Sequence, residues 1–294
     1  MSSSIWPTSE LRSNPPLPTS ALSPQELFNS IKKTILDSSE SADLSYESIP
    51  PPAGLQLATS FREDPDIEGA LPRSVFAFTT TISSNFVSYN SHTQTLTVRV
   101  KPTRVHDAHQ PWLDHEMLDM VVSGFLSVAE KKFLKRLVGT TFQGFVASYE
   151  ASSKEPDTCI LPDAQPLPTV VFETGWSESW PRLDHDKDLW LLGGAPTVQL
   201  VFLIKWSKSD GNRVKGEIQV YGRDGTGEPT LLQIEPIFPV PLGDPDQTLP
   251  ITRAQLFGAS VFPGRSPTDT YNLSIANLRA NADPFIRNMG FIPA

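Results

Sequence analysis

Apolar residues recur along this chain at helical spacing in some segments and at strand spacing in others. From about residue 114 to residue 137, Met117, Val121 and Phe125 belong to a series with the spacing of one helical face. Short runs rich in β-branched and aromatic residues then predict three consecutive strands. These runs lie at 142–149, 158–161 and 169–174.

The next segments continue this α/β alternation. A helix over about 180–192 has Ser179 as a candidate N-cap and Gly193-Gly194 at its end. The strand that follows, 198–206, is almost entirely apolar, which is typical of a strand covered on both faces. Two further strands are expected at 213–221 and 230–238, and the last fifty residues suggest a partly helical wrap.

The N-terminal region has a different composition. Residues 1–24 are rich in Ser and Pro, and Ser23-Pro24 starts one short helix with an apolar face. The acidic, Pro-containing stretch 38–66 reads as loose, and strands resume near Ser74. We therefore expect a flexible acidic arm with one short helix over 1–70, a folded domain over 71–240 with its core at about 110–210, and the wrap over 241–294.

Composition narrows the class of protein. The chain has 294 residues, of which 38% are hydrophobic, and a single cysteine, Cys159, which excludes an internal disulfide framework. No apolar run approaches the roughly 18 residues of a membrane span, and the first 20 residues lack the apolar segment of a secretory signal. These features predict an intracellular protein of the cytoplasm or nucleus without a membrane partner.

The formal net charge of −9 argues against a polyanionic partner, but the charge is unevenly distributed. Residues 1–70 hold ten acidic and four basic side chains, so the rest of the chain is close to neutral. A local basic cluster could contact nucleic acid, or could be the cationic last turn of a helix. Its members are Lys131, Lys132, Lys135 and Arg136.

Two carboxylates stand on neighbouring predicted strands. Asp157 precedes one short apolar strand, and Glu173 lies inside the next, among Val170, Val171 and Phe172. Such a pair can bind a divalent metal, and a nearby lysine can stabilise the charge of a phosphodiester transition state. The alternatives are that Asp157 is a turn residue and that Glu173 is protonated or paired with a basic group, because burying an unpaired carboxylate is costly.

The order of elements and these residues resemble the PD-(D/E)XK nuclease superfamily, the restriction-endonuclease-like fold. The resemblance covers about residues 110–210 and is carried by Lys154-Glu155-Pro156-Asp157, Glu173-Thr174-Gly175 and the helix with Asp186, Trp190 and Leu191. More narrowly, it is to an uncharacterised fungal branch of that superfamily. It implies an α/β core of helix, three strands, helix and strand, with additional strands on both sides.

The resemblance also implies a site. Asp157 and Glu173 match the two metal-binding acids, whereas Gly175 stands where the superfamily has its lysine. An acid on the first helix is expected as well, with Glu116 and Glu130 as alternatives. The glycine implies either that the lysine lies on another element or that the site is inactive.

Helical geometry suggests where a relocated lysine lies. On the helix after Glu173, Lys187 is about 40° from Leu183 and therefore on the stripe that faces the sheet. Lys187 is the preferred catalytic lysine, with Lys154 and Lys205 behind it. Asp186 is a further catalytic candidate, or it pairs with Arg182 on the helix surface.

We therefore expect a Mg²⁺- or Mn²⁺-dependent nuclease acting on nucleic acid, with Asp157 and Glu173 as metal ligands. The alternative is a catalytically inactive nuclease-like module that binds nucleic acid, a protein or a second copy of the chain. Other sites are disfavoured by spacing: Gly175–Ser179 lacks the final glycine of a serine-hydrolase elbow, and the histidines lack zinc-site spacing. These histidines are His106, His109 and His115.

Overall fold

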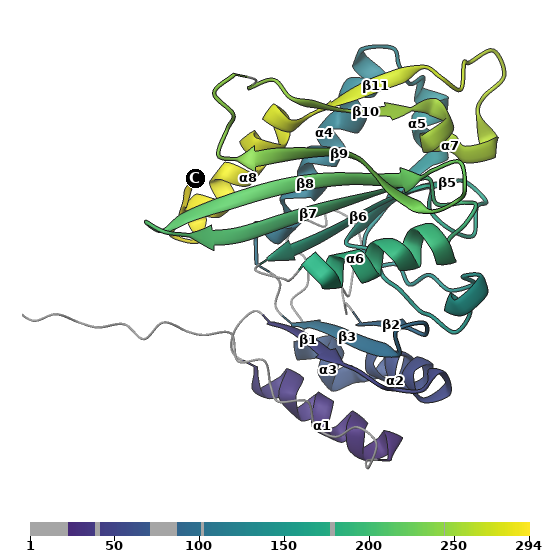
Figure 1. Cartoon of the computed structure of the whole chain (residues 1–294), viewed down its shortest axis with the longest axis vertical. Helices are drawn as coiled ribbons and strands as arrows, with labels where there is room; N and C mark the ends of the chain where they lie inside the picture. Colours follow the sequence, from purple (N-terminus) through teal and green to yellow (C-terminus); the bar gives the residue numbers. More distant parts are fainter. Residues whose placement is uncertain (1–22, 39–41, 71–86, 101–102, 177–179, 244) are drawn as a thin grey trace, which may run out of the picture.

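The computed structural model describes residues 23–38, 42–70, 87–100, 103–176, 180–243 and 245–294. The protein is a mixed α/β structure with a three-stranded, a two-stranded and a seven-stranded sheet. Figure 1 shows the N-terminal helices at one end of the molecule, then the three-stranded sheet, then α6 and the seven-stranded sheet. Helices α4 and α8 lie on the other side of that large sheet.

The described residues between 23 and 100 form what we call the N-terminal layer. Its helices pack on an antiparallel sheet of order β1-β3-β2, and a shared apolar cluster contains Ile31, Phe61 and Val98. Helix α1 begins with a capping box between Ser23 and Glu26. The elements are α1 (Pro24–Asp37), β1 (Ala42–Tyr46), α2 (Pro51–Glu63), α3 (Pro65–Ala70), β2 (Val87–Asn90) and β3 (Thr95–Val100).

This layer differs from the loose arm expected from composition. The proline run that suggested an irregular segment instead begins α2, where Pro51 occupies the first helical turn. Phe61 and Leu57 on that helix are buried against the sheet. This packing stabilises the helix, because intrinsic helix propensity alone is too weak to do so. The strand expected to begin near Ser74 and the segment 1–22 lie outside the described residues.

The large sheet has the order β12-β8-β7-β6-β5-β4, with β9 also paired to β8. Strands β4, β5 and β6 are successive antiparallel neighbours, and β7 runs parallel to β6 after the crossover through α6. The elements are β4 (Leu134–Leu137), β5 (Thr158–Pro162), β6 (Val170–Trp176), α6 (Trp180–Asp188), η4 (Leu189–Gly193), β7 (Leu200–Ser209), β8 (Arg213–Arg223) and β9 (Pro229–Phe238).

The long helix expected over 114–137 is divided. Helix α4 (His109–Val122) follows the turn η2 (His106–Ala108) and ends just before Gly124, whose φ of 78° a helix cannot accept. A capping box of Ser127 and Glu130 then starts the short helix α5 (Val128–Phe133). The first strand of the sheet is therefore β4, and not the expected strand at 142–149, where η3 (Ala147–Tyr149) forms a single turn.

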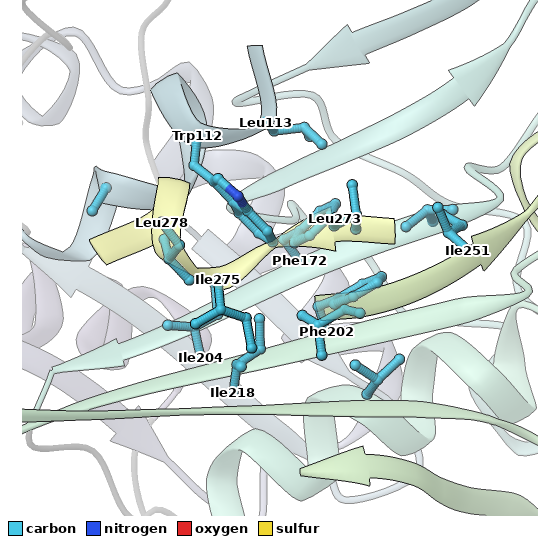
Figure 2. Close-up of a cluster of buried hydrophobic side chains, with 14 of the residues drawn as sticks. Trp112, Leu113, Phe172, Phe202, Ile204, Ile218, Ile251, Leu273, Ile275 and Leu278 are labelled. Carbon is cyan, nitrogen blue, oxygen red and sulfur yellow. The ribbon is translucent and has the colours of Figure 1, made fainter. Parts of the chain in front are cut away.

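The two faces of the large sheet have separate apolar cores. On one face, Phe172 and Phe202 stack with ring centroids 4.6 Å apart beneath Trp112 of α4, as Figure 2 shows. On the other face, α6 and the π-helical turn η4 bury Leu183 and Trp190. Residues of β6 and β7 alternate between the two cores, which explains their nearly continuous apolar sequences.

The C-terminal segment completes the first of these cores. Helix α8 packs beside α4, and Trp112 donates a hydrogen bond of 2.8 Å to the carbonyl of Ser274. Buried Arg253 joins the segment to α5 through Glu130, at 2.5 Å. The elements are β10 (Thr248–Thr252), α7 (Arg253–Phe257), η5 (Gly258–Ser260), β11 (Thr270–Ser274), α8 (Ile275–Asn288) and β12 (Ile292–Pro293).

Removing Arg253 should therefore be far more costly than removing an exposed arginine. We expect Arg253→Ala to lower the free energy of unfolding by about 3 kcal/mol, because buried Glu130 keeps only the partly exposed Arg265 as a charged partner. Arg287→Ala is the matched control, since Arg287 and Asp283 form an exposed pair on α8 and should contribute less than about 1 kcal/mol. Urea denaturation of both variants measures the difference, and equal losses would contradict this role for Arg253.

Candidate functional site

Asp157 and Glu173 lie where β5 begins and β6 passes beside it. Thr158, the first residue of β5, pairs with Phe172, and Asp157 and Glu173 are the next residues beyond this pair on the two segments. Each is about 1% exposed. Buried carboxylates need partners, and the partners of these two define the chemistry of the site.

Asp157 is held by groups from three elements. The Arg99 guanidinium of β3 forms an ion pair with Oδ1, and the Thr174 backbone N–H donates a 2.6 Å hydrogen bond to Oδ2. His106 Nε2 lies 3.3 Å from the same oxygen. Burial alone would raise the pKa of Asp157, but the positive charges of Arg99 and His106 hold this pKa well below its usual range. The carboxyl is therefore ionised.

The two histidines beside Asp157 differ in charge. Burial lowers the pKa of His106, but Asp157 outweighs this effect and raises the pKa to about 10, so His106 is a cation at neutral pH. His109 Nδ1 lies 2.9 Å from the His106 carbonyl and donates to it, and burial lowers the pKa of His109. His109 is therefore neutral at neutral pH, and Arg99 and His106 are the cations that contact Asp157.

Glu173 has a different set of partners. Its Oε1 accepts a 2.6 Å hydrogen bond from Trp190 Nε1 and lies 3.3 Å from Lys154 Nζ. The same amine is nearer to Asp186, at 2.7 Å. Burial lowers the pKa of Lys154, but Asp186 and Glu173 outweigh it and raise this pKa, so Lys154 is charged. Burial raises the pKa of Glu173 to about 8, and the nearby charge of Asp186 adds to this rise, while Lys154 offsets it only in part.

The structure places Lys154, and not the preferred Lys187, beside the acids. Lys187 Nζ lies 3.3 Å from both Asp184 and Asp188 and 4.7 Å from the centre of the Tyr221 ring. The side chain does turn towards the sheet, as the helical spacing predicts, but its length carries the amine to β8. Lys205 lies 4.9 Å above the Trp180 ring, so its amine also points elsewhere.

The acids considered for the first helix have structural partners. Glu116 accepts a 2.8 Å hydrogen bond from Asn277 on α8. Glu130 caps α5 and pairs with Arg253 and Arg265. Both acids thus attach the C-terminal segment, and their described partners include none of the residues around Asp157.

Sequence reasoning missed the basic groups that the N-terminal layer supplies. Arg99 alternates along β3 with the apolar Leu96, Val98 and Val100, so it lies on the other face of the strand, where it is buried. The sequence has no signal that this polar face is covered. A second ion pair joins Arg62 of α2 to Glu155, at 3.2 Å. Thr141 donates a 2.6 Å hydrogen bond to Glu155, yet burial outweighs both partners and raises the pKa of Glu155 to about 7.

These surroundings do not fit a divalent cation in the described arrangement. Mg²⁺ binds through carboxylate oxygens and water in a close octahedral shell. Both oxygens of Asp157 are engaged by Arg99, His106 and a backbone N–H, and Lys154 lies against Glu173. Among the described residues, no group of three or more His, Cys, Asp or Glu side chains has the geometry to hold a metal ion.

Comparison of the chain with protein-family models, curated proteins and solved structures found no match. Within the described ranges, no helix combines the length and apolarity needed to cross a bilayer. The function is therefore inferred from the residues of the site and the elements that carry them.

The raised pKa of Glu155 predicts a pH dependence of stability. Because its pKa is about 7 in the folded protein and about 4.5 when exposed, the folded state binds the extra proton between these values. Stability from this group is greatest below pH 4.5 and falls until pH 7. Relative to Glu155→Gln, the wild type should lose about 2 kcal/mol between pH 5 and pH 8. Urea unfolding at both pH values checks this, and parallel pH profiles would contradict it.

Proposed function

We propose that this chain is a restriction-endonuclease-like module that binds single-stranded nucleic acid and does not hydrolyse it while its acids are paired internally. The observation that carries the proposal is the pairing of buried Asp157 with Arg99 of the N-terminal layer. The absence of hydrolysis follows from that pair, and binding is argued from a separate surface.

The order of elements supports the fold assignment. Helices α4 and α5 precede three antiparallel strands, β4 to β6, and α6 leads to β7, which is parallel to β6. This is the order implied by the resemblance to the PD-(D/E)XK superfamily. In this order Asp157 precedes the second strand and Glu173 lies on the third. The amine beside Glu173 is that of Lys154, whereas Gly175 has no side chain to supply one.

The free energy of the internal ion pair between Arg99 and Asp157 is at least comparable with that of binding a metal ion. Removing one partner of a buried ion pair costs about 3–5 kcal/mol. A cation bound with millimolar affinity contributes about 4 kcal/mol, so it would gain little by displacing Arg99. A metal-dependent reaction therefore needs a rearrangement of the pair between Arg99 and Asp157.

A surface at the ends of β6 and β7 suits a single strand. Lys205 lies 4.9 Å above the Trp180 ring, and Lys208 lies 4.9 Å from the Phe291 ring centre and 5.9 Å from that of Trp176. Lys205 and Trp180 lie on the face covered by α6, and Lys208, Trp176 and Phe291 lie on the face covered by α4 and α8. We call these five residues together the aromatic–lysine surface. Stacking on aromatic rings together with lysine–phosphate contacts is how proteins bind single strands without sequence preference.

Neighbouring charges distinguish this surface from the basic cluster noted in the sequence. Arg213 and Lys215, both exposed, lie on β8 next to the end of β7, with Glu217 as a nearby acid. In the other cluster, Lys135 and Arg136 are already paired with Asp163 and Asp114. The aromatic–lysine surface therefore has more positive charge free for phosphate.

Metal-dependent phosphodiester hydrolysis is the second candidate function. It is favoured by the position of Lys154 Nζ, 3.3 Å from Glu173, and by the burial of Asp157 next to the pair of Thr158 and Phe172. In this case Asp157 and Glu173 would hold Mg²⁺ or Mn²⁺. Hydrolysis of several nucleic acids by wild-type protein with either ion, absent in Glu173→Gln, would favour this second function.

Binding can be tested with a fluorescent single-stranded oligonucleotide in EDTA, read by anisotropy. Replacing both Lys205 and Lys208 by Ala should weaken binding and lower the slope of log K against log salt by about 1.4, as expected for two lost phosphate contacts. The matched control is the double Ala variant of Lys131 and Lys132, which should bind like the wild type. Equal effects of the two double variants, or no binding by the wild type, would contradict the assignment.

A further inference from the structure

We propose that this chain forms a two-fold symmetric dimer through the exposed face of α4 and the adjoining α5, with a second copy of the same chain as the partner. The inference goes beyond the proposed function and does not depend on nucleic-acid binding. We call this surface the α4–α5 patch. Its residues are Leu118, Asp119, Val122, Val128, Lys131 and Lys132.

The centre of the patch is aliphatic and strongly exposed. The exposed fractions of Leu118, Val122 and Val128 are 58%, 78% and 61%. Among the large hydrophobic side chains of the described ranges, these are three of the four most exposed, and Leu242 is the fourth. Single exposed aliphatic residues are ordinary, but a group of them marks an interaction surface.

The path of the chain brings Val128 back to α4. Leu118 and Val122 are one turn apart on that helix, about 40° from each other around its axis. After the bend that ends α4, the Leu126 N–H donates a 2.8 Å hydrogen bond to the Met120 carbonyl, and α5 then packs beside α4. Figure 1 shows the two helices next to each other, with α5 at the end of the molecule opposite the N-terminal helices.

The patch is acidic on one side and basic on the other. Around the axis of α4, Asp119 lies about 100° from Leu118 in one direction, and Asp114 lies about 40° from it in the other. Asp114 pairs with Arg136 of β4 at 2.6 Å, so the segment of α5 and β4 lies on that second side. This segment carries the two lysines of the patch. The aliphatic centre therefore separates the lysines from Asp119.

The charges of the patch remain available to a partner. Arg136 is neutralised by Asp114, and Lys135 Nζ lies 3.6 Å from Asp163. In the part of the chain that the structure describes, the acid and the two lysines of the patch take part in no ion pair. An occupant must therefore match one negative side, an aliphatic centre and one positive side.

A second copy of the chain meets all three requirements. A two-fold axis through the aliphatic centre places Asp119 of each copy on the basic side of the other, and brings the two aliphatic groups together. Opposite charges around an apolar centre also fix the register of such an interface. A nucleic acid would contact the lysines and leave the aliphatic side chains exposed, and an acidic protein would leave Asp119 unmatched.

Sedimentation equilibrium of the full-length chain tests the association. The wild type should be a reversible dimer at or below about 100 µM, because interfaces of standard size have dissociation constants of micromolar or less. Leu118→Ser should raise the dimer dissociation constant at least about tenfold, because the lost contact occurs twice in a symmetric interface. The matched control is Leu242→Ser, which changes an exposed leucine outside the patch and should leave the constant unchanged.

Charge reversal tests the two-fold arrangement itself. Asp119→Lys, and the double variant Lys131→Glu with Lys132→Glu, should each be monomeric, because like charges then face each other across the axis. An equimolar mixture of the two proteins should form a heterodimer, because all facing charges are again opposite. Recovery of the dimer in the mixture requires both variants to be folded, so it also excludes unfolding as the cause of dissociation.

Three results would overturn the proposal. They are a wild type that stays monomeric at about 100 µM, equal dissociation constants for Leu118→Ser and Leu242→Ser, and a mixture of folded charge variants that stays monomeric. Thermal melts of each variant are recorded first. If a charge variant does not melt cooperatively, the comparison of the two leucine variants decides the outcome.

Discussion

The ion pair between Arg99 and Asp157 governs how the two parts of this protein fit together. A carboxylate that is 1% exposed cannot remain ionised without compensation, and its positive partner comes from a strand 58 residues earlier in the chain. His106 adds a second positive charge at 3.3 Å. Because the compensation crosses between two sheets, the position of the N-terminal layer and the charge state of Asp157 are linked.

The need for a positive partner also distinguishes the two buried acids, because each has a different one. Asp157 is ionised and fully engaged, whereas Glu173 depends on an amine that lies closer to Asp186. Trp190 adds a hydrogen bond to Glu173 from the turn that follows α6, so the packing of that helix also fixes this carboxylate. The acids that resemble a metal site thus act, in the described arrangement, as structural connections between β5, β6, α6 and the N-terminal layer.

Local sequence patterns were sufficient to predict the strands and helices whose own residues determine their structure. Strands β5 to β9 and helix α6 lie close to their expected positions, and Asp157 and Glu173 are both buried, each with its own set of partners. The break at Gly124 was missed because the apolar spacing continues through it. Lys154 was considered only after Lys187, and Arg99 was not identified at all, because the roles of both depend on contacts between distant segments. Lys187 was preferred on helical spacing, which cannot show where a long side chain ends.

The most direct measurement is a double-mutant cycle of Arg99→Gln and Asp157→Asn, evaluated by the free energy of unfolding without added metal. If the buried pair joins the layers, the double variant should lose much less stability than the sum of the losses of the two single variants. The coupling should then be about 2–3 kcal/mol, at the upper end of the range for interacting residues. A coupling within about 0.5 kcal/mol of zero would contradict the account, because the two residues would then contribute independently.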